Sequence, residues 1–298
     1  MPAESTRFAS SFGAAGLVIG GLACQEVGAG FATTLFPQVG AIGMVTVRLF
    51  FSAVMLLLVF RPSMRSRTRS DWVTVVAFGL SLAALNSLFY LALARLHLGA
   101  TVTIEYLGPL VLSVVIARRA SAWLWALLAF AGVALLGRGG FERLDPLGVA
   151  FALGAGVVWV GYILLSRRTG AQFARLDGLA MAMAVGSLVT IPFGIASAGV
   201  GLVQPFILLV GFAVAILSSA IPYGLELIAL RRLPASTFSI LLSFAPALAA
   251  VAGLIILHQT LEPLDVVAIG LVVIASMGAV RAASRRQLDL PPVADVPP

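Results

Sequence analysis

ATVTIEYLGPLVLSVVIARR, residues 100–119, is the stretch that decides the fold. It opens with about 18 mostly apolar residues, enough for a helix to cross a bilayer, and it closes on Arg118 and Arg119. Glu105 lies inside it, and a carboxylate at bilayer depth costs on the order of 2.5–3.5 kcal/mol. Pro109, four residues on, removes the amide that would donate to the Glu105 carbonyl. A membrane helix whose charged residue lies beside a proline-disrupted hydrogen bond is predicted to line a polar cavity.

The rest of the chain has the composition of a membrane protein. Of its 298 residues, 60% are hydrophobic and 10% are charged, whereas a soluble domain has roughly 25% charged residues. Apolar segments of spanning length predict an all-α polytopic membrane protein with ten transmembrane helices. These segments are at about 12–35, 41–60, 72–93, 100–117, 121–137, 147–166, 177–198, 206–230, 235–257 and 265–281.

The charges predict the orientation of these spans. All 19 basic residues are arginine, and most of them lie in alternate loops, which the positive-inside rule assigns to the cytoplasm. Both termini are therefore predicted to be cytoplasmic, residues 1–11 as a short N-terminal segment and residues 282–298 as a disordered, proline-rich tail. Because the net charge of +7 follows the loops, it does not indicate nucleic acid as a partner.

The two halves of the chain resemble each other. An offset of 137 residues aligns ALARL at 92–96 with ALRRL at 229–233, and it aligns Pro109 with Pro246. Each half then holds five spans, at 12–137 and 147–281, and an odd number inverts the second half. Inverted repeats are typical of secondary transporters, whose substrate binds near the midplane between the halves. Pro109 and Pro246 are the predicted hinges.

Small residues recur every four positions in two of the spans. Gly16, Gly20, Cys24 and Gly28 form one such stripe, and GxxxAxxxG at 148–156 forms another. Such stripes predict close helix contacts.

Ionisable residues at membrane depth are the first functional candidates because of their cost. They are Glu26, Arg48, Glu105 and Glu226. Glu226 has an alternative interpretation, since it lies five residues before Arg231 and reaches the inner interface if the helix ends there. Arg48 has two interpretations, a structural ion pair with Glu26 or Glu105 and a receptor for a substrate carboxylate. Burial disfavours the charged form of a carboxyl group, so Glu105 is the predicted proton carrier.

Polar and aromatic side chains on neighbouring spans complete the predicted substrate site, although membrane-interface anchoring is an alternative for its tyrosines and tryptophan. Together with Glu26, Arg48 and Glu105, the set contains Asn86, Tyr90, Tyr106, Trp159, Tyr162, Tyr223 and Ser243. The two histidines lie in outer turns, and no metal-binding, nucleophile or phosphate-cradling motif occurs. The sequence therefore predicts no enzyme, no metal and no cofactor.

Several motifs resemble one known family. Residues 104–110 (IEYLGPL) are similar to the fourth-span segment of the threonine/homoserine exporter family, within the EamA-type drug/metabolite transporters. The similarity extends over roughly residues 12–281, and it is strongest at 217–254. The resemblance implies ten spans in two inverted halves of a bacterial-type inner membrane protein that exports small amino acids or related metabolites by proton antiport.

The chain departs from this family at two places. Ala245 stands where the ninth span of the family usually has a glutamate, and His258-Gln259 replace a Gly-Glu pair. Because this chain lacks that carboxylate, the usual substrate of the family and its coupling to protons do not carry over directly. The predicted partners are a small-molecule substrate, protons and membrane lipids. A monomer is compatible with these features, and the sequence does not fix the oligomeric state.

Two transport functions fit these residues. The first is export of threonine-like or homoserine-like amino acids or of related polar metabolites. The alternative is a broad exporter of drugs or hydrophobic cations that uses the glutamates and aromatic residues, against which Arg48 argues because a buried cation repels cationic cargo. An enzyme or a scaffold lacks support in the motifs.

Overall fold

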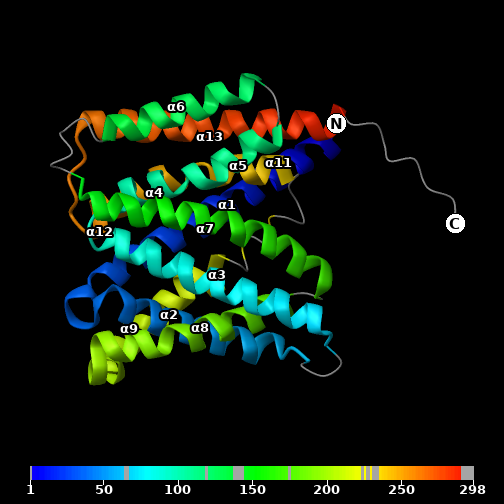
Figure 1. Ribbon diagram of the computed structural model, residues 1–298. Helices are drawn as coiled ribbons and strands as arrows, with labels where there is room; N and C mark the ends of the chain where they lie inside the picture. Colours follow the sequence, from blue (N-terminus) through cyan, green and yellow to red (C-terminus); the bar gives the residue numbers. More distant parts are fainter. Residues whose placement is uncertain are drawn as a thin grey trace, which may run out of the picture.

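The computed structural model contains helices and no strands in the residues it describes. These residues are 2–63, 67–117, 120–136, 144–173, 176–222, 225, 229 and 235–289, and their side chains are described except at 2–12, 14, 116, 117, 120–122, 235, 236 and 282–289. Figure 1 shows the long helices side by side, with their axes running across the view. The predicted all-α class is confirmed.

The helices follow the predicted apolar segments. In chain order they are α1 (Pro2–Thr33), α2 (Phe36–Phe60), α3 (Arg69–Leu93), α4 (Leu98–Glu105), α5 (Leu107–Ala117), α6 (Ala120–Leu136), α7 (Pro146–Gln172), α8 (Asp177–Ala198), η1 (Gly199–Val203), α9 (Pro205–Ala215), η2 (Ile216–Ala220), α11 (Ala235–Leu242), α12 (Ala245–Ile256) and α13 (Pro263–Asp289). Within the described residues, 8 segments are long and apolar enough to cross a membrane, and two apolar helices, Trp123–Leu136 and Pro205–Ala220, are shorter. The full plan of ten inverted spans stays a prediction.

Two of the boundaries differ from the predicted spans. α1 begins at Pro2, within the predicted N-terminal segment, and α13 continues to Asp289, within the predicted tail. Residues 290–298 lie outside the described part of the chain.

Local sequence signals explain where helices begin. Thr68 and Asp71 form a capping box at the start of α3, because the Asp71 amide donates to Thr68 Oγ1 and the Thr68 amide donates to Asp71 Oδ2. At the start of α7 the carboxylate of Asp145 accepts from the amides of Leu147 and Gly148, and proline follows it at the first helical position. Both arrangements satisfy amides that have no partner inside the helix.

Two of the spans are broken in the middle. α4 ends at Glu105 and α5 begins at Leu107, while α11 ends at Leu242 and α12 begins at Ala245. Pro109 and Pro246 stand within a turn of these breaks, as the loss of a helical amide requires. The offset of 137 residues that aligns the two prolines also aligns Tyr106 in the first break with Ser243 in the second.

Glycines let the broken helix α4–α5 lie directly on α7. A Cβ on Gly108 would overlap the backbone of Gly156, and a Cβ on Gly156 would lie 2.6 Å from the Glu105 carbonyl oxygen. Further along α7, Ala152 is buried beside Ile104 and Leu96, and a Cβ on Gly148 would lie 2.8–2.9 Å from the side chains of Leu96 and Arg95, so the predicted stripe in α7 does make close contacts. The stripe in α1 does so only in part: Gly28 packs on Ser218, but Gly16 is exposed and meets nothing within 4 Å.

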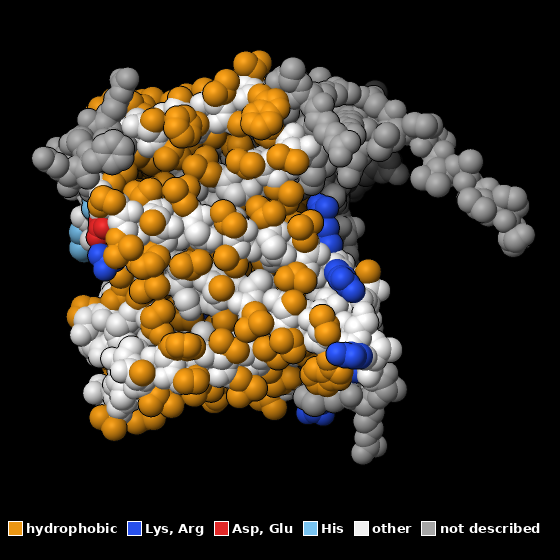
Figure 2. Space-filling view, in the orientation of Figure 1, with side chains coloured by type: hydrophobic (Ala, Val, Ile, Leu, Met, Phe, Trp, Pro, Cys, Tyr) orange, Lys and Arg blue, Asp and Glu red, His pale blue; other side chains and the backbone are white. Residues whose placement is uncertain are grey.

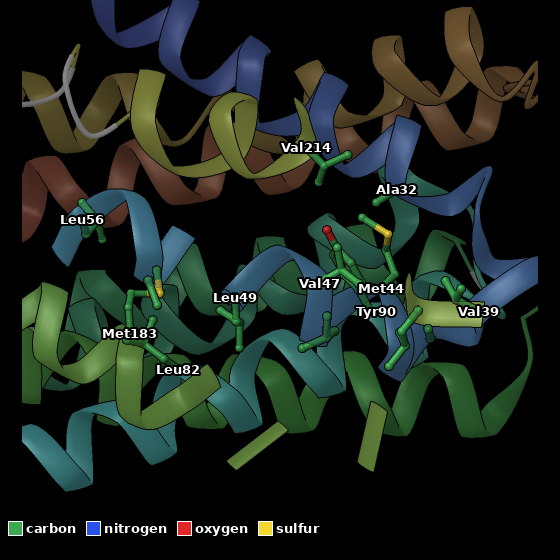
Figure 3. Close-up of a cluster of buried hydrophobic side chains, with 14 of the residues drawn as sticks. Ala32, Val39, Met44, Val47, Leu49, Leu56, Leu82, Tyr90, Met183 and Val214 are labelled. Carbon is green, nitrogen blue, oxygen red and sulfur yellow. The ribbon is translucent and has the colours of Figure 1, made fainter. Parts of the chain in front are cut away.

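The largest apolar core joins α2, α3 and α8, with Tyr90, Met44 and Leu49 among its buried members (Figure 3). The outward faces are also apolar, since Figure 2 shows hydrophobic side chains over most of the visible surface, with arginines gathered along one edge. Phe130 is 68% exposed and Val157 is 71% exposed. A water-facing surface seldom carries an apolar area of this extent, whereas a membrane-spanning one requires it.

Candidate functional site

The broken helix α4–α5 forms one wall of a central cavity of about 600 Å³. Its walls come from α1, α2, α3, α7, η2, α11 and α13 as well. Most of the predicted site residues line it, although they are far apart in the sequence. They are Glu26, Arg48, Asn86, Glu105, Tyr106, Trp159, Tyr162 and Ser243, together with Pro109.

Two of the described predicted residues, Tyr90 and Pro246, do not line this cavity. Tyr90 is fully buried behind Arg48. Pro246 is buried in α12, away from the cavity wall. Tyr223 lies outside the described residues, as does Glu226.

Arg48 is held from one side by Tyr90. Its Nη1 donates to the Tyr90 hydroxyl at 3.2 Å, and the guanidinium carbon lies 5.5 Å from the centre of the Tyr90 ring. Its Nε is buried and has no hydrogen-bond partner. Among the described residues, ion pairs within 4.0 Å join Arg67 to Asp177 and Arg95 to Asp145, and Arg48 takes part in neither.

The two described carboxylates of the cavity are buried and separate from Arg48. Glu26 is 3% exposed and Glu105 is 8% exposed. Glu26 Oε2 has no hydrogen-bond partner. Both groups and Arg48 are close enough to interact electrostatically without forming an ion pair. Opposite charges that are buried together and left unpaired are costly, so the arrangement is suited to a charged or zwitterionic ligand.

Aromatic side chains also line the cavity. The ring of Tyr106, at the break between α4 and α5, meets Trp159 of α7 edge to face, with centroids 4.8 Å apart. Tyr162, one turn further along α7, packs on Phe78 with centroids 5.2 Å apart. Trp159 and Tyr162 thus line the cavity.

Sequence reasoning missed several polar residues of the cavity. Ser218 and Ser276 line it with buried hydroxyl oxygens that lack partners. Their positions in apolar spans give no signal, because isolated serines are common there. Arg167 also lines the cavity. The sequence places it in an inner loop, but α7 continues beyond it to Gln172.

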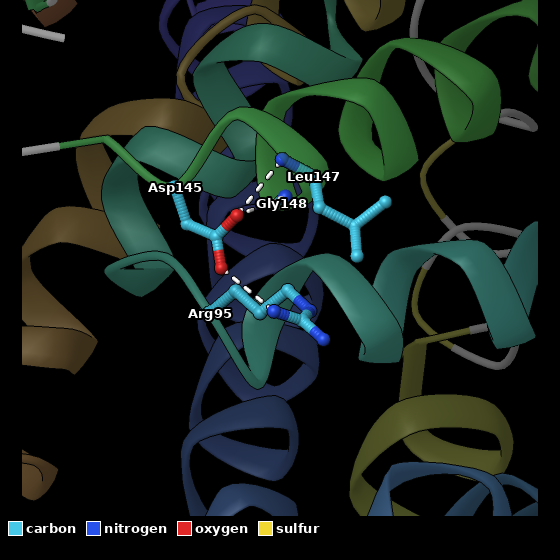
Figure 4. Close-up of polar contacts among 4 residues, drawn as sticks. All are labelled: Arg95, Asp145, Leu147 and Gly148. Atoms are coloured by element: carbon cyan, nitrogen blue, oxygen red, sulfur yellow. Dashed lines mark hydrogen bonds and ion pairs between the residues drawn. The ribbon is translucent and has the colours of Figure 1, made fainter.

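The cavity extends toward the arginine-rich ends of the helices. Arg167 near the end of α7 and Val280 beside Arg281 both line it. At the other end the chain is tied together: Leu98 N donates to Gln259 Oε1 at 3.0 Å, and Arg95 Nη1 donates to Asp145 Oδ2 at 2.7 Å (Figure 4). The bond from Arg95, together with the amides of Leu147 and Gly148, lowers the pKa of the Asp145 carboxyl group.

The fold and this cavity define the class: a multi-pass helical membrane protein with a polar cavity inside its helical body. Comparison with known proteins assigns the chain to a family within this class. Residues 146–281 match the model of the EamA-like transporter family. The chain is 38% identical over 275 residues to the threonine/homoserine exporter RhtA of Escherichia coli, covering 90% of this chain and 93% of that protein. It is 39% identical over 256 residues to the protein of the same name from Salmonella typhimurium, covering 85% and 86%.

The chain therefore belongs to the EamA-like transporter family. Its relatives are named as exporters, and it is a transporter-type protein, not an enzyme. This agrees with the expectation drawn from the residues of the fourth span.

Proposed function

We propose that this protein exports small amino acids similar to threonine and homoserine, or related polar metabolites, across a bacterial-type inner membrane. The observation that carries the proposal is the cavity itself, in which the buried Glu26 and Glu105 and the half-buried Arg48 form no ion pair with one another. A small zwitterion complements these charges, and its size is well below the volume of about 600 Å³. The names of the relatives point to the same substrates.

Proton antiport is the proposed coupling, with Glu105 as the proton carrier. Glu105 ends α4 at the break before Pro109, where a change in the angle between α4 and α5 alters its exposure. A carboxyl group that alternates between buried and hydrated settings changes its affinity for protons, because burial disfavours the charged form. One proton moving down 100 mV supplies about 2.3 kcal/mol, which sustains roughly a fifty-fold gradient of a neutral solute.

The proposed topology is ten spans in two inverted halves, with both termini in the cytoplasm. The matching breaks near Pro109 and Pro246 support the repeat. So does the packing, since α4 and α5 both contact α7, while their counterparts α11 and α12 both contact α1; this is the exchange that a two-fold axis in the membrane plane produces. The arginine-rich loops support the orientation.

Everted membrane vesicles test the transport proposal. Labelled threonine or homoserine is expected to accumulate in the lumen when the lumen is acidified, and collapse of the pH gradient is expected to release it. Glu105→Gln is expected to abolish accumulation while leaving uncoupled exchange across the membrane. The matched control is Glu262→Gln, which removes a carboxylate outside the central cavity. Coupled uptake by Glu105→Gln at the wild-type level would refute the role of Glu105.

Export of hydrophobic cations is the competing function, favoured by the aromatic pair Tyr106 and Trp159. Arg48 opposes it, because the cavity holds a guanidinium group with an unpartnered nitrogen. A susceptibility profile decides: resistance to cationic dyes in expressing cells, without any effect on amino acid efflux, would replace the first proposal with the second.

A further inference from the structure

Two residues that line the central cavity each have a buried polar atom without a hydrogen-bond partner. One is Nε of Arg48, and the other is Oε2 of Glu26. Leaving a buried charged group without a partner costs more than an ordinary hydrogen bond contributes. Because both residues line the same cavity and carry opposite charges, a ligand with both charges satisfies them together.

Tyr90 determines which edge of Arg48 is available. The tyrosine is 0% exposed, and it packs between Phe36 and Phe89 with ring centroids 5.6 Å and 5.7 Å away. Its hydroxyl occupies Nη1 of Arg48. Nε has no hydrogen-bond partner in the protein, so the edge that includes it is left for a ligand that enters the cavity. An arginine edge binds a carboxylate through two parallel hydrogen bonds.

Glu26 supplies the opposite charge from a different helix. It projects from α1, whereas Arg48 belongs to α2, and the two form no ion pair within 4.0 Å. Direct pairing would neutralise the site, whereas separation leaves room for a ligand between the groups. An ammonium group is the natural partner of the free carboxylate oxygen, since it brings donors as well as charge.

Resting on the proposed export of amino acids, we infer that Glu26 and Arg48 bind the two charged ends of a free α-amino acid. Arg48 receives the carboxylate, and Glu26 receives the ammonium group. Glu105 stays outside this pair, at the break between α4 and α5, and serves the proton. The pairing excludes lactones, amides and acylated amino acids as good substrates, because each of these lacks one of the two charges.

Binding to the purified full-length chain in lipid nanodiscs tests the pairing by calorimetry. The probes are L-threonine, L-threoninamide, which lacks the carboxylate, and N-acetyl-L-threonine, which lacks the ammonium group. The wild-type protein is expected to bind threonine roughly tenfold or more tightly than either analogue. Arg48→Gln is expected to weaken threonine binding by a similar factor but to change threoninamide binding less than about twofold.

Glu26→Gln is expected to weaken the binding of threonine but not that of N-acetyl-L-threonine, because the latter has no ammonium group for Glu26 to bind. Arg168→Gln, one of the exposed arginines of α7 outside the cavity lining, is the control and is expected to bind all three probes as the wild type does. Arg48→Lys retains the positive charge but lacks the two parallel N–H donors of the guanidinium group. It is therefore expected to fold and still lose affinity for threonine.

The outcomes separate the pairing from the proposed function. Equal effects of Arg48→Gln and Glu26→Gln on all three probes, with tight wild-type binding of threonine, overturn the pairing and leave the function standing. If Arg48→Gln or Glu26→Gln fails to fold, the wild-type protein alone tests the pairing. Equal affinity of the wild-type protein for the three probes would then overturn the pairing. Binding of none of the probes by a well-folded wild-type protein overturns both.

Discussion

At the scale of single residues, charge at membrane depth is the most informative feature of this chain. Glu26, Arg48 and Glu105 are costly wherever they lie in a span, and the structure brings all three to one cavity. Of the two interpretations of Arg48, an ion pair with Glu26 or Glu105 is not among the described contacts, and its role as a receptor for a substrate carboxylate stays a prediction. Arg48 bonds to Tyr90 and keeps Nε free.

His258 is strained by its backbone. It has φ 53, in the left-handed region that costs an ordinary residue roughly 1–2 kcal/mol. We predict that His258→Gly stabilises the protein by roughly 0.5–1 kcal/mol, net of the entropy that glycine adds to the unfolded chain. The measurement is the Tm in detergent.

His258→Ala is the matched control, because it removes the imidazole and retains the Cβ that causes the strain. It is expected to bring no gain in Tm. If alanine stabilises the protein as much as glycine does, the effect comes from the imidazole and the backbone argument is wrong.

At the scale of elements, the break between α4 and α5 depends on both proline and glycine. Pro109 leaves the Glu105 carbonyl without its helical donor, and this oxygen lies against Gly156 of α7. The proline was visible in the sequence and predicted the break. The glycine contact was indicated only as one of two small-residue stripes, of which the one in α7 packs along its length.

Gly156→Ala is predicted to push α7 away from this break, because the added Cβ meets backbone atoms that cannot rotate aside. The expected loss is about 1–3 kcal/mol of stability, as for other overpacked sites, together with weaker substrate binding because Glu105 moves. Thermal unfolding and threonine binding are the measurements.

Gly161→Ala on the same helix is the control, since a Cβ there meets nothing within 4 Å. It is expected to leave stability unchanged or slightly higher, because alanine favours the helix. Equal destabilisation by the two substitutions would assign the effect to glycine in general and would contradict the close-approach argument.

At the scale of the whole molecule, one ion pair ties the end of α3 to the start of α7, opposite the arginine-rich edge. Arg95 and Asp145 lie 50 positions apart in the sequence and meet at 2.7 Å. Asp145 also caps α7 (Figure 4). Because the pKa of Asp145 is lowered from its ordinary value of 3.8, the stabilisation is present above that value and is lost as the pH falls through the lowered pKa.

The wild-type Tm is therefore predicted to fall on acidification in a way that Asp145→Asn does not reproduce. Asparagine caps a helix about as well as aspartate, so this substitution removes the ion pair and keeps the cap. Asp145→Ala removes both and is expected to lower the Tm further than Asp145→Asn does, because alanine is a poor helix cap. The measurement is the Tm as a function of pH. The same acid dependence in Asp145→Asn would show that other groups cause it.

The sequence alone determined the helices, their apolar lengths, the break at Pro109 and the short set of charged residues at depth, because each follows from composition or from neighbours within a helical turn. The tertiary structure decided which of these residues share a cavity, that Tyr90 holds Arg48, that Ser218 and Ser276 join the site, and that Gln259 binds the amide of Leu98, 161 positions away. These contacts join distant segments, and helix packing sets their geometry through side chains whose partners no local pattern specifies.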